Sequence, residues 1–195
     1  MNTDEIKQVT EKINLYALGV LSPPRYAHSL RVAHLARELS ERFGLDPYVG
    51  YLAGIAHDMC KSGKDRWLLA LAVQDQSPVN EIELEKPALL HGRAAAVMLY
   101  NEFGIKDGSI LSAVKNHTFG APEMDDLEKI VFVADKVEPG RTCLDPEFRQ
   151  KILRSDLDAM TMMVLEDNVQ YLESRGKKVS IITLQALENL KGSRK

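Results

Sequence analysis

The histidines of this chain are few, and most of them fall into an ordered series with aspartates. The chain has 195 residues and five histidines. The series runs His28, His57-Asp58, His91, His117 and Asp135. Neutral imidazole and carboxylate groups are common ligands of first-row divalent metal ions. Up to six such ligands are more consistent with two metal ions than with one tetrahedral zinc. The pattern therefore predicts a metal centre, with His34 outside it.

Each residue of the series also has a purely structural interpretation when it is taken alone. His28 could be a satisfied core histidine, and Asp135 could be a paired carboxylate. His91 could serve as a capping residue at the start of a helix, and His117 as a favourable charge at the end of one. An ionisable pair such as His57-Asp58 at the end of a buried helix is costly unless a partner or a metal compensates it. The ordered series favours one shared explanation.

Helices are predicted to position these residues. Apolar side chains recur at the helical spacing after Ser22-Pro23-Pro24, and Val32, Leu35, Ala36, Leu39 and Phe43 mark the buried stripe of a helix over 24–43. His28 lies on this stripe and His34 on the wet face. Further helices are expected over 46–58, 64–74, 91–103, 107–117, 125–138, 155–175 and 181–191, the last with Ser180 as its N-cap. A polar loop is expected at about 75–86.

These elements predict the fold class all-α, as one domain over residues 1–195. We expect a helical bundle of about eight to ten helices, with core motifs at about 23–141 and C-terminal helices at about 145–191. Apolar residues make up 45% of the chain and charged residues 27%, which is ordinary for a globular protein. The basic end at 191–195 is interpreted as solvated.

Charge and composition exclude several classes of function. The net charge of −3 argues against a dedicated binder of nucleic acid or of anionic membranes. Two cysteines, Cys60 and Cys143, cannot form a disulfide framework, which favours a reducing compartment. No apolar run approaches the ~20 residues that span a bilayer, and the N-terminus does not resemble a signal peptide. We therefore expect a cytoplasmic protein.

With this series of histidines and aspartates, the sequence resembles the HD-domain metal-dependent phosphohydrolases. His28, His57-Asp58 and Asp135 match the core pattern, and His91 and His117 match the additional ligands of the dinuclear branch. The finer resemblance is to the bacterial YqeK-type symmetrical bis(5′-nucleosyl)-tetraphosphatases. It covers about 23–190, through stretches at 25–32, 53–61, 90–92, 116–118, 134–141, 156–158 and 171–177. The stretch 135–141 is the specific part.

The resemblance implies a divalent metal cofactor, iron or a related ion, with one or two ions per chain. His28, His57, Asp58 and Asp135 would hold the core metal. His91 and His117 would complete a second site or contact substrate phosphates, and Asp58 could bridge. His57 and Asp58 are the implied catalytic pair. A metal-bound hydroxide would attack diadenosine tetraphosphate, which would be cut symmetrically into two ADP.

The substrate contacts implied by the resemblance are cations and hydroxyls near the motifs. Lys61 and Arg141 are the expected phosphate clamps, since lysine offers a point charge and arginine a bidentate fork. The other candidates are His91, His117, Thr118, Arg31, Lys178, Ser180 and Thr183. Arg31 could instead pair with a carboxylate, and the segment from Lys178 to Thr183 could wall the nucleotide pocket or merely lead into a helix.

Other functions remain open at the level of sequence. A rival enzyme is an HD phosphohydrolase of another nucleotide, such as a monoester, an alarmone or a cyclic nucleotide. A different class is a nucleotide-binding HD module without turnover, and a third is a purely structural helical bundle without stoichiometric metal. The expected partner is the nucleotide substrate, with ADP as product, and neither nucleic acid nor membrane; a homodimer is an option.

Overall fold

The computed structural model describes residues 1–192, and every regular element in that range is helical. The α-helices are α1 (Thr3–Val20), α2 (Pro23–Arg42), α3 (Pro47–Ala56), α4 (Asp65–Ala72), α5 (Glu81–Glu85), α6 (His91–Asn101), α7 (Gly108–Asn116), α8 (Asp126–Val137), α9 (Pro146–Arg154), α10 (Leu157–Ser174) and α11 (Ile181–Gly192). Two short 3-10 helices, η1 (Val73–Asp75) and η2 (Pro87–Leu90), lie between α4 and α6. The all-α prediction is confirmed. Most of the basic end, 193–195, lies outside the described residues.

The eight helices predicted from periodicity are all present, and three further helices were not predicted. These are α1, α5 and α9. In α1 and α5 the asparagine before the helix and the glutamate three residues later cap each other: Asn2 with Glu5, and Asn80 with Glu83. Such a capping box satisfies two backbone donors at a helix start. It explains why residues 81–85, expected as polar loop, form a short helix.

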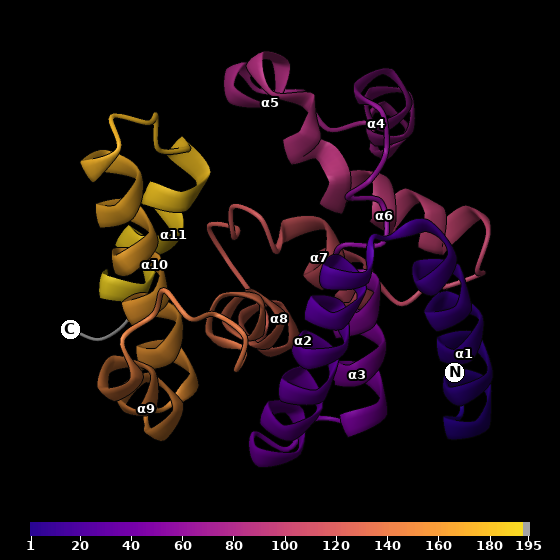
Figure 1. The fold of residues 1–195 in the computed structure, drawn as a ribbon, viewed down its shortest axis with the longest axis horizontal. Helices are drawn as coiled ribbons and strands as arrows, with labels where there is room; N and C mark the ends of the chain where they lie inside the picture. The colour runs from indigo at the N-terminus through magenta and orange to yellow at the C-terminus, as the bar shows by residue number, and fades with distance from the viewer. Residues whose placement is uncertain (193–195) are drawn as a thin grey trace.

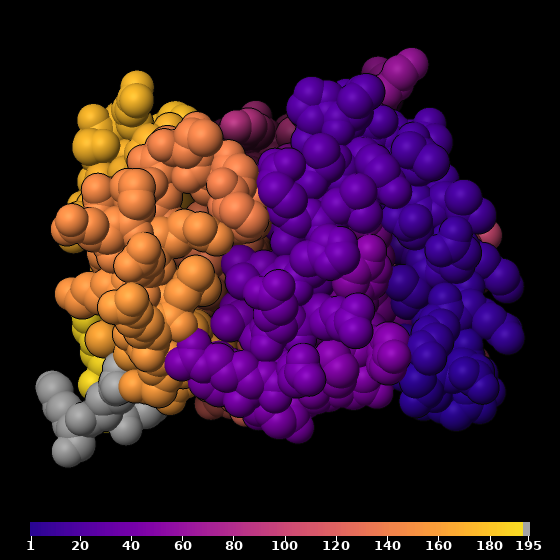
Figure 2. All heavy atoms as spheres, turned by 60° about the horizontal axis from the view of Figure 1, so that its bottom comes forward, coloured from indigo at the N-terminus to yellow at the C-terminus, as the bar shows by residue number. Residues whose placement is uncertain are grey.

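The helices are arranged on two sides of α8 (Figure 1). Helices α2 and α3 run side by side, and α1 packs against α3 on the far side. Helices α9, α10 and α11 form the other side, where α10 packs on α8 (Figure 1). Figure 2 shows the same division on one face, with the C-terminal helices beside the purple α2 and the indigo α1 at the opposite end.

Two clusters of buried apolar side chains hold these halves together. The predicted stripe of α2 is confirmed, because Val32, Leu35 and Leu39 are buried against α8 to α11. Ala33 of the same helix belongs to the other cluster, which is built from α1, α3, α4, α6 and α7. Helix α8 likewise contributes to both clusters. Helices α2 and α8 therefore lie where the two cores meet.

Within residues 1–192, no helix combines the length and the apolar character that crossing a membrane requires.

Candidate metal centre

Three of the histidines lie at helix ends in the same local geometry. His57 follows α3, His91 follows η2, and His117 follows α7. In each ring Nδ1 lies within hydrogen-bonding distance of the carbonyl oxygen three residues earlier: 2.6 Å to Gly54, 2.8 Å to Ala88 and 2.8 Å to Val114. Because Nδ1–H donates to a carbonyl, Nε2 is left with its lone pair. The backbone thus fixes the tautomer that binds metal ions through Nε2.

The Nε2 atoms of His91 and His117 converge on Asp58. They lie 3.0 Å from each other, and 2.9 Å and 3.5 Å from Oδ1 of Asp58. Burial lowers the pKa of His117 to about 3, so this ring is neutral at pH 7. The neutral Nε2 of His117 therefore offers a lone pair beside Nε2 of His91 and Oδ1 of Asp58. This arrangement suits a cation bound by Asp58, His91 and His117.

A second group of ligand atoms adjoins the first. Nε2 of His28, on α2, lies 3.0 Å from Oδ1 of Asp135, on α8. Nε2 of His57 lies 3.7 Å from Asp135 and 3.7 Å from Asp58. This Nε2 atom is buried and lacks a hydrogen-bond partner. A buried acceptor without a donor is costly, and a metal ion would satisfy it.

The ligand atoms form three overlapping sets, each within 4.8 Å. The sets are His28, His57 and Asp58; His57, His117 and Asp135; and Asp58, His91 and His117. Asp58 belongs to the first and the last of these sets. The residues present therefore fit one or two divalent ions, and a carboxylate shared between two sets is placed as a bridging ligand would be.

Two glycines allow the helices to bring these ligands together. A Cβ atom on Gly54 would lie 2.6 Å from Cα of Ala33, so α3 could not approach α2 as closely with any other residue. A Cβ atom on Gly92 would lie 2.9 Å from the carbonyl oxygens of Val114 and Lys115. The close approach of α6 to α7 places His91 beside His117.

The expected cations are found at the edges of this centre. Nζ of Lys61 lies 2.9 Å from Nε2 of His91 and 3.3 Å from Oδ1 of Asp58. The guanidinium of Arg141 donates to Oδ1 of Asp135 over 2.8 Å. Thr118 Oγ1 lies 3.5 Å from His91 Nε2. These three side chains thus line the centre.

Arg31 pairs with a carboxylate that sequence reasoning missed. Glu138 is buried; it accepts hydrogen bonds from Arg31 and the backbone N–H of Gly140, and its Oε1 lies 3.0 Å from His28 Nδ1. Burial alone would raise the pKa of Glu138, but these hydrogen bonds lower it to about 2. Glu138 follows Asp135 by three residues, the spacing of one helix face, and this signal could have identified it.

Lys136 is a second residue beside the centre that was not predicted from the sequence. Its Nζ donates to the carbonyl oxygen of His117 over 2.8 Å and to Oδ2 of Asp135 over 3.0 Å. Burial lowers the pKa of this ammonium group. Lysine side chains are common on helix surfaces. Nothing in the sequence therefore indicated that the side chain of Lys136 points inward. It links the ends of α7 and α8 across the centre.

The remaining candidates for substrate binding form their hydrogen bonds and ion pairs with residues other than the six candidate ligands. Lys178 pairs with Glu85, Ser180 accepts from the backbone N–H of Ile182, and Thr183 donates to the carbonyl oxygen of Phe119. Within the described residues, none of the three has a hydrogen bond or ion pair with a histidine or aspartate of the centre. The bond of Ser180 agrees with its predicted capping position. His34 is exposed, as predicted, and packs edge-on against Tyr51.

Fold and site together define an all-helical protein with a buried cluster of histidines and aspartates that could hold metal ions. A family model described as "HD domain" matches residues 25–140, which include all six candidate ligands. The chain is 30% identical over 159 residues to the "Bis(5′-nucleosyl)-tetraphosphatase, symmetrical" of Bacillus subtilis, covering 82% of this chain and 85% of that protein. The protein of the same description from Staphylococcus aureus is 39% identical over 132 residues, 68% of either chain.

One solved structure is also similar to this chain. It is an HD superfamily hydrolase from Clostridium acetobutylicum described as involved in NAD metabolism, with a TM-score of 0.85, 28% identity, and coverage of 95% of this chain and 97% of that one. The chain belongs to the HD domain family and, within it, to the group of the symmetrical bis(5′-nucleosyl)-tetraphosphatases.

Proposed function

We propose that this protein is a divalent-metal-dependent hydrolase that cleaves diadenosine tetraphosphate symmetrically into two ADP. The observation that carries the proposal is the convergence of buried Nε2 atoms on Asp58, with His57 Nε2 left without a hydrogen-bond partner. The curated relatives carry the name of this activity. Iron is the first candidate for the ion because the resemblance to the HD-domain phosphohydrolases implies it; the ligand types themselves suit iron, manganese, cobalt, nickel and zinc.

We assign the ligands in two groups that share Asp58. His28, His57 and Asp135 would hold one ion with Asp58, and His91 and His117 would hold the other. Divalent ions in such a centre lower the pKa of a bound water and neutralise phosphate oxygens. Hydrolysis would add the oxygen of one water to a central phosphorus atom, while the bridging oxygen leaves with the other ADP and the proton of the water passes to solvent. His57 and Asp58 would act by holding the ions and so positioning the reacting groups.

Lys61 and Arg141 are assigned to the phosphate groups of the substrate. Both now pair with ligand carboxylates, Lys61 with Asp58 and Arg141 with Asp135. A metal ion would compete for the negative charge of these carboxylates, which frees the two cations to bind phosphate oxygens. Thr118, beside His91 and His117, can donate a further hydrogen bond.

The proposal is tested by metal analysis and product identification on one preparation. We expect the metal-loaded protein to release ADP alone from diadenosine tetraphosphate, as resolved by anion-exchange chromatography. Asp58→Ala should lower the rate by at least about 100-fold and reduce bound metal, because it removes the shared ligand.

The matched control is His34→Ala, which removes the exposed histidine outside the centre and should retain both metal and rate. Release of ATP and AMP would contradict symmetrical cleavage. Turnover of a nucleotide monoester, an alarmone or a cyclic nucleotide in place of diadenosine tetraphosphate would show a different phosphohydrolase.

A further inference from the structure

A cavity of about 840 Å³ opens beside the metal centre, between α8, α9 and α10. Binding cavities for small molecules typically measure about 300–1,000 Å³. Asp135, Lys136 and Arg141 form one wall, so the cavity adjoins the first group of ligands. A smaller cavity of about 270 Å³ includes Thr118 and therefore adjoins His91 and His117. Each of the two groups of ligand atoms thus has a cavity next to it.

The lining of the larger cavity combines charged and apolar side chains. Lys136 and Arg141 supply positive charge next to the centre. Leu144, Phe148 and Val164 are among the apolar residues, and Asp145 and Asp167 add carboxylates. Cations beside the centre together with apolar side chains suit a ligand that has phosphates at one end and a less polar group at the other.

The helix α10 and the residue after its C-terminal end contribute further lining residues. Asn168, Tyr171 and Arg175 follow each other at spacings of three and four residues, so they share one helix face. The Tyr171 side chain is 52% exposed, and the Arg175 guanidinium lies 5.6 Å from its ring centroid. Aromatic rings and guanidinium groups both stack on nucleobases. Asn168 adds an amide that can hydrogen-bond to a base edge.

We propose that this cavity binds one nucleoside diphosphate half of the substrate, with its base on Tyr171 and its phosphates at Lys136 and Arg141. The inference rests on the proposed function, because symmetrical cleavage places a nucleoside diphosphate on each side of the cut bond. The proposal gives Asn168, Tyr171 and Arg175 a role in binding the base. None of the three was among the substrate contacts expected from the sequence.

The exposed Cys143 provides a native probe, because it lines this cavity whereas Cys60 is buried. In the metal-loaded full chain, ADP at about ten times its Kd should slow alkylation of Cys143 by N-ethylmaleimide by about tenfold. Peptide mass spectrometry measures the rate at this cysteine. Inorganic pyrophosphate should protect much less, since it lacks the base.

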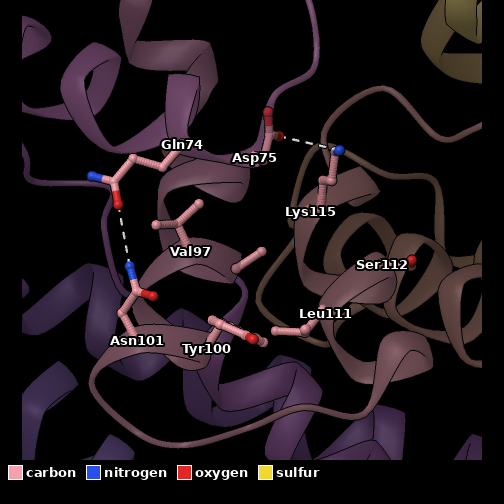
Figure 3. A pocket seen from close by; sticks show the side chains of 9 residues that line it. Gln74, Asp75, Val97, Tyr100, Asn101, Leu111, Ser112 and Lys115 are labelled. Carbon is pink, nitrogen blue, oxygen red and sulfur yellow. Dashed lines mark hydrogen bonds and ion pairs between the residues drawn. The ribbon is translucent and has the colours of Figure 1, made fainter.

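Tyr171→Ala should weaken ADP affinity by about tenfold in the same assay, the loss expected for one base stack. The matched control is Tyr100→Ala. Tyr100 is 50% exposed, but it lines another cavity on α6, whose lining residues do not include any of the six candidate ligands (Figure 3). This variant should bind ADP like the unmodified protein. Thermal unfolding confirms that both variants are folded.

Three results would overturn the assignment of this cavity. Pyrophosphate could protect Cys143 as well as ADP does, ADP could fail to protect Cys143, or Tyr171→Ala could leave the affinity for ADP unchanged. Hydrolysis of diadenosine tetraphosphate is measured on the same preparations. Hydrolysis without protection of Cys143 contradicts the cavity and leaves the proposed function standing. Protection that Tyr171→Ala weakens, without hydrolysis, contradicts the proposed function and supports the cavity as a nucleotide site.

Discussion

At the scale of single residues, the centre depends on groups that orient the ligands as well as on the ligands. Backbone carbonyls fix the rings of His57, His91 and His117, but the corresponding partner of His28 is the carboxylate of Glu138. A carboxylate behind a histidine orients its ring and raises its basicity as a ligand. Arg31 and Gly140 hold Glu138 in turn. Glu138 is therefore a positioning residue.

Glu138→Gln should weaken metal binding by about 10–100-fold, the usual cost of losing an orienting partner. Titration of the metal-free protein with Mn²⁺ measures the change. Glu85→Gln, which removes an exposed glutamate paired with Lys178, is the control and should have no effect. Unaltered Mn²⁺ affinity in Glu138→Gln would show that the ring of His28 does not need this partner.

The same substitution has a pH signature in the metal-free protein. The folded pKa of Glu138, about 2, lies below its ordinary value of 4.5. Its contribution to stability is thus present above pH 4.5 and is lost as the pH falls through about 2. The difference in Tm between the unmodified protein and Glu138→Gln should therefore shrink across this interval.

At the scale of helices, the geometry depends on how closely α6 approaches α7. His91 begins α6 and His117 follows α7, so their Nε2 atoms meet only if the two helix ends nearly touch. Gly92 permits this contact, since its missing side chain leaves room for the carbonyls of α7. Interiors are close-packed, so one added methyl group is felt.

Gly92→Ala should force α6 and α7 apart, lower the free energy of unfolding by about 1–3 kcal/mol, and reduce metal binding. Denaturant unfolding and metal analysis measure both effects. Gly108→Ala is the control, because a Cβ atom at this helix start meets no atom within 4 Å. If Gly92→Ala retains full metal content and stability, the close contact is not what brings His91 and His117 together.

At the scale of the whole molecule, the candidate ligands join segments that are far apart in the sequence. His28 is on α2, His57-Asp58 follow α3, His91 begins α6, His117 follows α7 and Asp135 is on α8. Helices α2 and α8 contribute to both apolar clusters, so the centre lies where the two cores meet. A bound ion would link all of these elements. Metal binding should therefore stabilise the folded state as a whole.

Removal of metal with EDTA should lower the stability of the metal-loaded protein by about 3 kcal/mol when the free metal was at about 100 times its Kd. Differential scanning calorimetry before and after chelation measures the change in Tm. Asp58→Ala, which lacks the shared ligand, should show little response to EDTA. An equal response in both proteins would mean that the stabilising ion is bound elsewhere.

The sequence by itself determined eight of the helices and the order of the six candidate ligands. Helical periodicity placed Val32, Leu35 and Leu39 in the core, and left His34 on the surface, because a 3.6-residue repeat decides which side chains are buried. The HD-domain resemblance followed from the same series. Capping boxes at Asn2 and Asn80 were present, and their helices could have been predicted from them.

Only the tertiary structure decided which groups surround the ligands. The contact of Glu138 with His28 joins residues 110 positions apart, and Lys136 reaches the end of another helix. The structure pairs Lys178, Ser180 and Thr183 with Glu85 and with the backbone of Ile182 and Phe119, and their contact with substrate stays a prediction. The cavity at Tyr171 is formed by three helices at once. Local periodicity fixes the face of a helix, whereas contacts between helices depend on packing of the whole chain, which no short stretch of sequence encodes.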